Sequence, residues 1–306
     1  EVRCEVFASF VWVNLDPAAT PLADHLGPVA HQIAGYRMEQ MHRTHWVTLE
    51  GDWNWKCVQD NFNESYHLPF VHPQTRFVME QSYKDCQFDL YAPHGHARMF
   101  MPGSRPARSL RGHTDTVLEM MAKELTYWGL DPEDFRDDPL RTREAIQQAK
   151  RKLGAEKGYD FSHFHDAQLT DHFHYTIFPN ISFSLKPDGC IWLRADPHPT
   201  DPERCYFDMW YFTWFPEGAD RYYSYSMGEE VDRTIPVPHK RGKVGELSCG
   251  PGIDQDVIDQ FEGVALFKQF QKFCENDAFH VYFPWGHCGC LIAGLATSMA
   301  VKEWYV

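Results

Sequence analysis

The 306-residue chain lacks a long apolar run and an excess of basic side chains. Its most hydrophobic stretch, residues 288–301, is too short and too rich in glycine, serine and threonine to cross a bilayer. Acidic residues outnumber basic ones by 43 to 29, so the surface does not suit nucleic acid or an anionic membrane. No charged segment followed by an apolar one opens the sequence. We therefore expect a cytoplasmic protein whose partners include neither nucleic acid nor a membrane.

The composition and the apolar patterning predict a mixed α+β fold. Hydrophobic residues make up 43% of the chain and aromatic residues 15%, which can fill a sizeable core. Alternating apolar residues between Gly, Pro or Asp turns predict strands over 5–15, 45–49, 87–91, 97–101, 174–185, 190–196 and 205–215. Residues 185–190 carry a hairpin signal. The charged segment 115–157 is predicted to form a helical cap, with an apolar stripe of Val117, Met120, Met121, Leu125 and Trp128.

Residues 60–73 place a carboxylate and two imidazoles within a short stretch, Asp-Asn-Phe-Asn-Glu-Ser-Tyr-His-Leu-Pro-Phe-Val-His-Pro. We interpret 60–68 as the end of a helix that Pro69 stops, because an interior proline removes a backbone donor and clashes with the preceding turn. The break would let the chain turn back after His67. His72, five residues later, could then converge with His67 on one ion.

Two neutral imidazoles and one oxygen ligand leave open positions on a metal, the arrangement of non-heme Fe(II) in oxygen-activating enzymes. Zinc is the other candidate. A hydrolytic zinc helix spaces its two histidines four apart, with a glutamate beside the first. Here His67 and His72 are five apart and a proline intervenes. The spacing therefore favours iron.

Residues 54–56, Asn-Trp-Lys, leading into 60–67 and on to His72, resemble the alpha subunit of Rieske non-heme iron ring-hydroxylating oxygenases. The resemblance covers the catalytic domain only, and segments 10–17, 178–180 and 194–199 also fit it. It implies an α+β, START-like helix-grip fold. In that fold a curved antiparallel sheet surrounds a long C-terminal helix, with an apolar cavity between them.

A Rieske cluster needs two cysteines and two histidines. In this family they come from a Cys-x-His and a later Cys-x-x-His pattern, and none of the nine cysteines stands in either. We therefore expect residues 1–306 to form a single catalytic domain, with 115–157 as an inserted helical cap and 1–40 as the connector from a missing Rieske domain. The 2Fe-2S Rieske cluster would then lie on that missing domain or on a partner chain.

The resemblance implies that His67 and His72 bind Fe(II), and that the third ligand is a carboxylate at the start of the last long helix. The Gln-Asp pair of the family favours Asp256, whereas a helical wheel favours Asp254 facing inward. We select Asp256, with Asp254 as the second choice.

The resemblance also implies roles for three residues of segment 60–73. Glu64 would link the site to a Rieske histidine of a neighbouring subunit. Asn61 would lie close to the iron, and Asp60 would support that network. Glutamate at position 64 resembles the branch that acts on quaternary amines. The remaining close histidine pairs are interpreted as ordinary bonded side chains, namely His94 with His96, His163 with His165, and His172 with His174.

The implied activity is hydroxylation or dihydroxylation of an apolar, aromatic or polycyclic small molecule by O2. Electrons would come from NAD(P)H through a reductase or ferredoxin, and the family is usually a homotrimer. Two alternatives remain open. One is a non-catalytic helix-grip ligand-binding protein with a vestigial metal site, and the other is a zinc hydrolase. The sequence leaves the identity of the substrate and the number of inserted oxygen atoms open.

Overall fold

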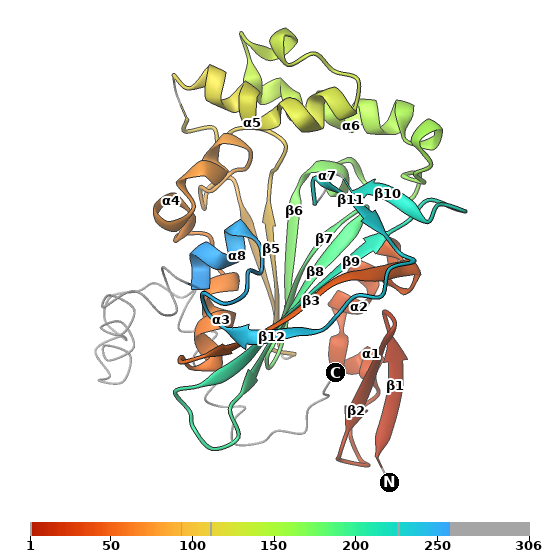
Figure 1. The fold of residues 1–306 in the computed structure, drawn as a ribbon, viewed down its shortest axis with the longest axis vertical. Helices are drawn as coiled ribbons and strands as arrows, with labels where there is room; N and C mark the ends of the chain where they lie inside the picture. Colours follow the sequence, from red (N-terminus) through yellow and green to blue (C-terminus); the bar gives the residue numbers. More distant parts are fainter. Residues whose placement is uncertain (1, 93, 111, 225–226, 258–306) are drawn as a thin grey trace.

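The computed structural model describes residues 2–257, apart from 93, 111 and 225–226. Its centre is a sheet of eight strands in the order β12-β3-β9-β8-β7-β6-β5-β4 (Figure 1). All neighbours are antiparallel except β12, which runs parallel to β3. The strands are β3 Met41–Gly51, β4 Gln87–Tyr91, β5 His96–Met101, β6 His172–Ile177, β7 Ile181–Lys186, β8 Gly189–Pro197, β9 Cys205–Trp214 and β12 Lys240–Lys243. This confirms the mixed α+β class and the mostly antiparallel sheet.

Both faces of the sheet are covered, because successive side chains of a strand point to opposite faces. On β8, Trp192 packs into a core that includes the helices α1 (Leu22–Leu26) and α2 (Pro28–Ile33). Its neighbour Leu193 packs on the other face, in a core shared with α3 (Trp55–Phe62). The segment 60–73, the candidate metal-binding motif, therefore belongs to the face covered by α3.

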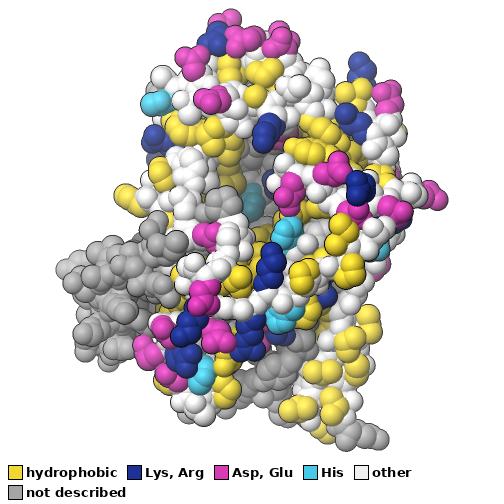
Figure 2. All heavy atoms as spheres, in the orientation of Figure 1, with side chains coloured by type: hydrophobic (Ala, Val, Ile, Leu, Met, Phe, Trp, Pro, Cys, Tyr) yellow, Lys and Arg dark blue, Asp and Glu magenta, His cyan; other side chains and the backbone are white. Residues whose placement is uncertain are grey.

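Two predicted single strands are hairpins. Residues 5–15 divide into β1 (Arg3–Phe7) and β2 (Phe10–Asn14), which reverse at Ala8 and Ser9, both with positive φ. Residues 174–185 divide into β6 and β7. Unbroken apolar patterning concealed both reversals, whereas the hairpin predicted at 185–190 is confirmed by the pairing of β7 with β8. The β1–β2 hairpin leaves apolar side chains exposed (Figure 2), namely Val2, Val6, Val11 and Leu15.

The segment 115–157, predicted to be helical, contains α5 (Thr114–Tyr127) and α6 (Thr142–Leu153), which lie across one end of the sheet in Figure 1. Four members of the expected apolar stripe are buried: Val117, Met121, Leu125 and Trp128. Met120 is 40% exposed, so its assignment to the stripe was wrong.

The remaining elements are short. They are α4 Leu68–Val71, α7 Asp166–Thr170, α8 Pro251–Gln255, β10 Arg221–Ser224, β11 Glu229–Asp232, and the 3-10 turns η1 Ala34–Tyr36, η2 Met38–Gln40, η3 Pro73–Phe77, η4 Pro132–Phe135, η5 Pro139–Arg141 and η6 Ala155–Lys157. Within the described ranges, no helix has the length and apolarity needed to span a bilayer. The long C-terminal helix that the family resemblance implies, and the tail 281–306, fall outside the described residues.

Candidate metal centre

The motif begins on α3, whose first turn is capped by Asn54. The Asn54 side chain accepts a hydrogen bond from the backbone N–H of Lys56 at 2.9 Å. The helix ends at Phe62, so the predicted helix over 60–68 was wrong. Pro69 does not stop a helix, because it lies in the first turn of α4. A proline is tolerated there, since the first helical N–H groups have no partner within the helix.

His67 and His72 stand at the two ends of α4. His67 immediately precedes it and His72 immediately follows it. Across this short helix the two imidazole rings lie close together, with centroids 5.4 Å apart. Asp256 reaches them from α8, 184 residues beyond His72. One ligand atom from each of the three lies within 4.8 Å of the other two.

Both rings present Nε2 to the same carboxylate oxygen. Asp256 Oδ1 lies 2.7 Å from Nε2 of His72 and 3.5 Å from Nε2 of His67. The other ring nitrogen of each histidine, Nδ1, already has a hydrogen-bond partner. Nδ1 of His67 donates to Glu64 Oε1, and Nδ1 of His72 donates to Gln255 Oε1 at 2.9 Å. Such partners fix the tautomer and the orientation of a ligand imidazole.

The donor set fits a divalent cation. With Nδ1–H donating to Gln255, a neutral His72 turns the lone pair of Nε2 toward an Asp256 oxygen only 2.7 Å away. Two acceptors at that distance repel each other unless a proton or a cation lies between them. Asn61 supports the fit, because its amide nitrogen and oxygen are buried without a hydrogen-bond partner among the described residues.

Asp254 lies elsewhere. Its carboxylate accepts hydrogen bonds from the hydroxyl of Ser248 at 2.5 Å and the backbone N–H of Cys249 at 2.7 Å. It therefore stabilises the loop before α8, and the helical-wheel argument that turned it inward was wrong. The wheel assumed a regular helix, whereas α8 is only five residues long.

A sequence model of the ring hydroxylating alpha subunit (catalytic domain) matches residues 38–221, more than half of the chain. The chain belongs to this family. The match confirms the expected family membership and corresponds to the catalytic domain of the family.

Relatives of this ring-hydroxylating alpha subunit include the carnitine monooxygenase oxygenase subunit of Escherichia coli (strain K12), 33% identical over 78 residues. Those residues are 24% of this chain and 20% of that relative. The quaternary ammonium Rieske monooxygenase CntA in complex with L-carnitine is 13% identical at a TM-score of 0.45, covering 97% of this chain and 60% of that one. Dicamba monooxygenase bound to dicamba is 11% identical at a TM-score of 0.43, and the match covers 97% of this chain and 68% of that one. The chain thus spans about three-fifths of the length of CntA.

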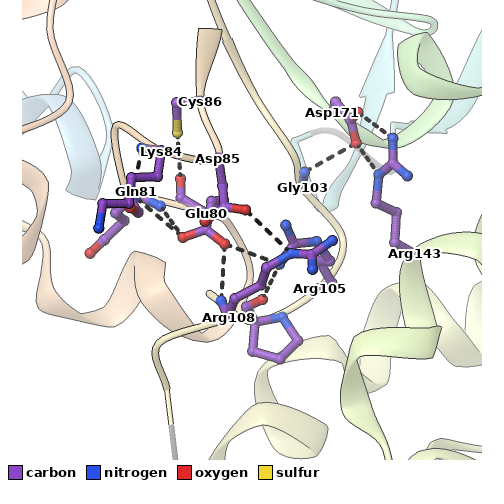
Figure 3. A network of polar contacts seen from close by, with 12 residues as sticks. Glu80, Gln81, Lys84, Asp85, Cys86, Gly103, Arg105, Arg108, Arg143 and Asp171 are labelled. Atoms are coloured by element: carbon purple, nitrogen blue, oxygen red, sulfur yellow. Dashed lines mark hydrogen bonds and ion pairs between the residues drawn. The ribbon is translucent and has the colours of Figure 1, made fainter.

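The segment that follows η3 is anchored by a buried carboxylate, Glu80, at the centre of the network in Figure 3. Burial alone would raise the pKa of Glu80, but backbone N–H groups and the Arg105 guanidinium outweigh this and hold it below its ordinary value. The N–H donors include that of Arg108, and the Arg105 contact is 3.2 Å. The network holds the chain just beyond His72 against the segment that follows β5.

Asp60 lies in the last turn of α3, four residues before Glu64, which follows the end of the helix. Burial raises the pKa of Asp60 to about 7, with a contribution from the charge of Glu64, while Lys56 lowers it. Burial thus favours the neutral form of the Asp60 carboxyl. The structure places Asp60, Asn61 and Glu64 within one turn of helix and the bend that follows it.

A cavity of about 660 Å³ lies between the sheet and the helices α3, α4 and α8. This volume is ordinary for a small-molecule site. The cavity includes the two histidines and Asp256, and much of its wall is apolar. Five methionines contribute, together with leucine and isoleucine side chains: Met79, Met99, Met101, Met209, Met227, Leu68, Ile191, Leu193 and Ile253.

The sequence reading missed two polar wall residues, His172 and His174 on β6. Their alternate spacing showed that they share a face of a strand, but not which face meets the cavity. Gln255 was missed as well. Its only signal was its position before Asp256.

Proposed function

We propose that this chain is the catalytic domain of an oxygenase that hydroxylates or dihydroxylates an apolar small molecule, with His67, His72 and Asp256 holding one Fe(II). The observation that carries the proposal is the convergence of two oriented Nε2 atoms and one carboxylate on the wall of a largely apolar cavity. When bound, Fe(II) supplies the O2-activating chemistry known for two histidines and one carboxylate.

The residues of the chain have separable tasks in this mechanism. Glu64 and Gln255 keep a proton on Nδ1 of each histidine, so that both Nε2 lone pairs are available to the metal. Asp256 supplies the anionic ligand. The apolar wall binds the body of the substrate and excludes water from the reacting groups.

We further propose that electrons reach the site from NAD(P)H through a reductase or ferredoxin and a 2Fe-2S Rieske cluster on a missing domain or a partner chain. Glu64 supports this route, because it contacts His67 directly and stands where the family places its bridging acid. We also propose a homotrimer, the assembly that is usual in the family. The described sheet is also compatible with the START-like helix-grip arrangement, and with one catalytic domain over 1–306 that has residues 1–40 as connector and 115–157 as cap.

We propose an uncharged, aromatic or polycyclic substrate rather than carnitine, which carries both a quaternary ammonium and a carboxylate. Among the described lining residues the basic side chains are Lys240, which is exposed, and histidines. A bound carboxylate would therefore lack a buried arginine or lysine. The number of methionines also suits an apolar body of irregular shape.

The deciding experiment is metal analysis after anaerobic loading with Fe(II). We expect about one iron per chain in the wild type and loss of iron in His67→Ala. Asp254→Ala is the matched control and should keep its iron, because Asp254 belongs to the loop before α8. Bound zinc with activity in the absence of reductant would indicate a hydrolase. A wild-type protein that never retains stoichiometric iron would support the alternative of a non-catalytic ligand-binding protein.

A further inference from the structure

Five side chains form a row across the cavity face of the sheet. Met99, His174, Ser184, Ile191 and Tyr211 are consecutive cross-strand partners on β5, β6, β7, β8 and β9. All five line the cavity. Because paired residues share a face, the row is fixed by the register of the sheet. His174 and Ser184 are neighbouring polar members of this row.

Ser184 holds two histidines. Its hydroxyl lies 2.8 Å from Nδ1 of His174 and 3.1 Å from Nε2 of His172. A hydroxyl has one hydrogen and two lone pairs, so it donates to at most one of the two rings and accepts from the other. This arrangement uses Nδ1 of His174 and orients its ring, which also stacks on Phe62 with centroids 5.8 Å apart.

The other nitrogen of His174, Nε2, is left without a hydrogen-bond partner among the described residues. This atom is buried, and the whole side chain is 3% exposed. Leaving a buried polar atom unpaired costs folding free energy, and natural proteins rarely do so without a reason. Since His174 lines the cavity, a ligand group is the natural partner.

The charges around the cavity indicate which kind of ligand group would pair with Nε2 of His174. Burial lowers the pKa of His174 to about 3 and that of His172 to about 4, so both rings are neutral at physiological pH. The described carboxylates that line the cavity are Glu64, Glu229 and Asp256. A neutral imidazole cannot form an ion pair, and nearby acidic groups disfavour an anionic ligand.

We infer that His174 recognises an uncharged oxygen group on the substrate, with Ser184 and His172 as positioning residues that orient its ring. The substrate class is an apolar ring compound with one hydroxyl or carbonyl group. That the bound molecule is a substrate rests on the proposed function, whereas recognition of a ligand by His174 does not. Hydrogen bonding at one end of an apolar body would fix which part of the molecule faces His67 and His72.

The test is equilibrium binding to the purified full chain, measured by calorimetry with four probes of one shape. They are naphthalene, 2-naphthol, 2-naphthoate and trimethyl(2-naphthyl)ammonium. The 2-naphthol hydroxyl can donate or accept, so it can pair with either tautomer of His174. We expect 2-naphthol to bind about 10-fold more tightly than naphthalene, the effect of one additional hydrogen bond. Both ions should bind more weakly than 2-naphthol.

Variants assign this preference to His174. His174→Phe keeps a ring to stack on Phe62 and should remove the preference for 2-naphthol over naphthalene. His174→Gln should restore part of it. Met99→Leu is the matched control, because it changes the cross-strand neighbour on the same wall and should keep the full preference. An imidazole ¹⁵N shift of His174 on 2-naphthol binding gives a readout that a purely structural role would not produce.

Two results would overturn the inference: equal wild-type affinity for naphthalene and 2-naphthol, or tighter binding of either ion. The wild-type comparison needs no variant, so it stands even if His174→Phe does not fold. Binding by His67→Ala separates this inference from the proposed function. If that variant lacks iron yet prefers 2-naphthol, recognition by His174 is supported without any metal. A wild type with stoichiometric iron and no preference refutes the inference alone.

Discussion

Replacing Gln255 by leucine tests whether the second contact of His72 prepares it for metal binding. The substitution removes the acceptor 2.9 Å from Nδ1 of His72 and also leaves the Gln74 amide, which donates to the same oxygen at 2.6 Å, without that partner. Loss of such an outer contact typically weakens metal binding 10- to 100-fold. We expect Fe(II) affinity to fall by that factor, or about 1.4 to 2.8 kcal/mol.

The assay is anaerobic competition for Fe(II) against a chromophoric chelator, with far-UV circular dichroism to verify folding. Asp254→Asn is the control on the same short helix. It alters contacts with Ser248 and Cys249 but none of the ligand residues, so Fe(II) affinity should stay within about twofold of the wild type. A folded Gln255→Leu protein with wild-type affinity would refute the idea that Gln255 orients His72.

Three further outcomes follow from buried groups. Glu80→Gln should lower the free energy of unfolding by about 3 to 5 kcal/mol, since it leaves the Arg105 charge unpaired, and urea unfolding at pH 7 measures this. Leu125→Ala in the helical cap should cost about 2 to 5 kcal/mol, and a thermal melt that matches the wild type would contradict the packing described for α5. The folded pKa of Asp60, about 7, lies above its ordinary 3.8, so stability should fall as pH rises from about 4 to 7. Asp60→Asn should reduce that fall, as urea unfolding at pH 5 and pH 8 would show; an unchanged pH profile would mean that Asp60 titrates normally.

Most strands could be predicted from local patterns, because the alternation of apolar residues and the turn residues are visible within a few positions of the sequence. These patterns failed at Ala8–Ser9 and between β6 and β7, where the apolar pattern continues through the reversal. They failed again at Pro69, whose effect depends on whether a helix ends or begins there. Proline restricts both cases in the same way, so the sequence alone could not separate them.

The site was predictable where its residues are close in sequence and less so where they come from distant segments. His67 and His72 were found from their spacing, whereas choosing between Asp256 and Asp254 required knowing how the chain enters α8. His174 could not be identified beforehand, because its role depends on the register that aligns β6 with Ser184 on β7. Register is a long-range property, and a shift by one residue would turn His174 to the opposite face.

The position of α8 in the chain has a consequence for how the centre assembles. Every strand of the eight-stranded sheet is complete by Lys243, whereas Gln255 and Asp256 come afterwards on one short segment. That segment carries both the proposed anionic ligand and the side chain that contacts Nδ1 of His72. A chain ending at residue 250 would retain all the sequence that forms the sheet and the cap. It would nevertheless lose the Asp256 carboxylate and the Gln255 amide together, so we expect such a chain to lose Fe(II) binding before it loses the sheet.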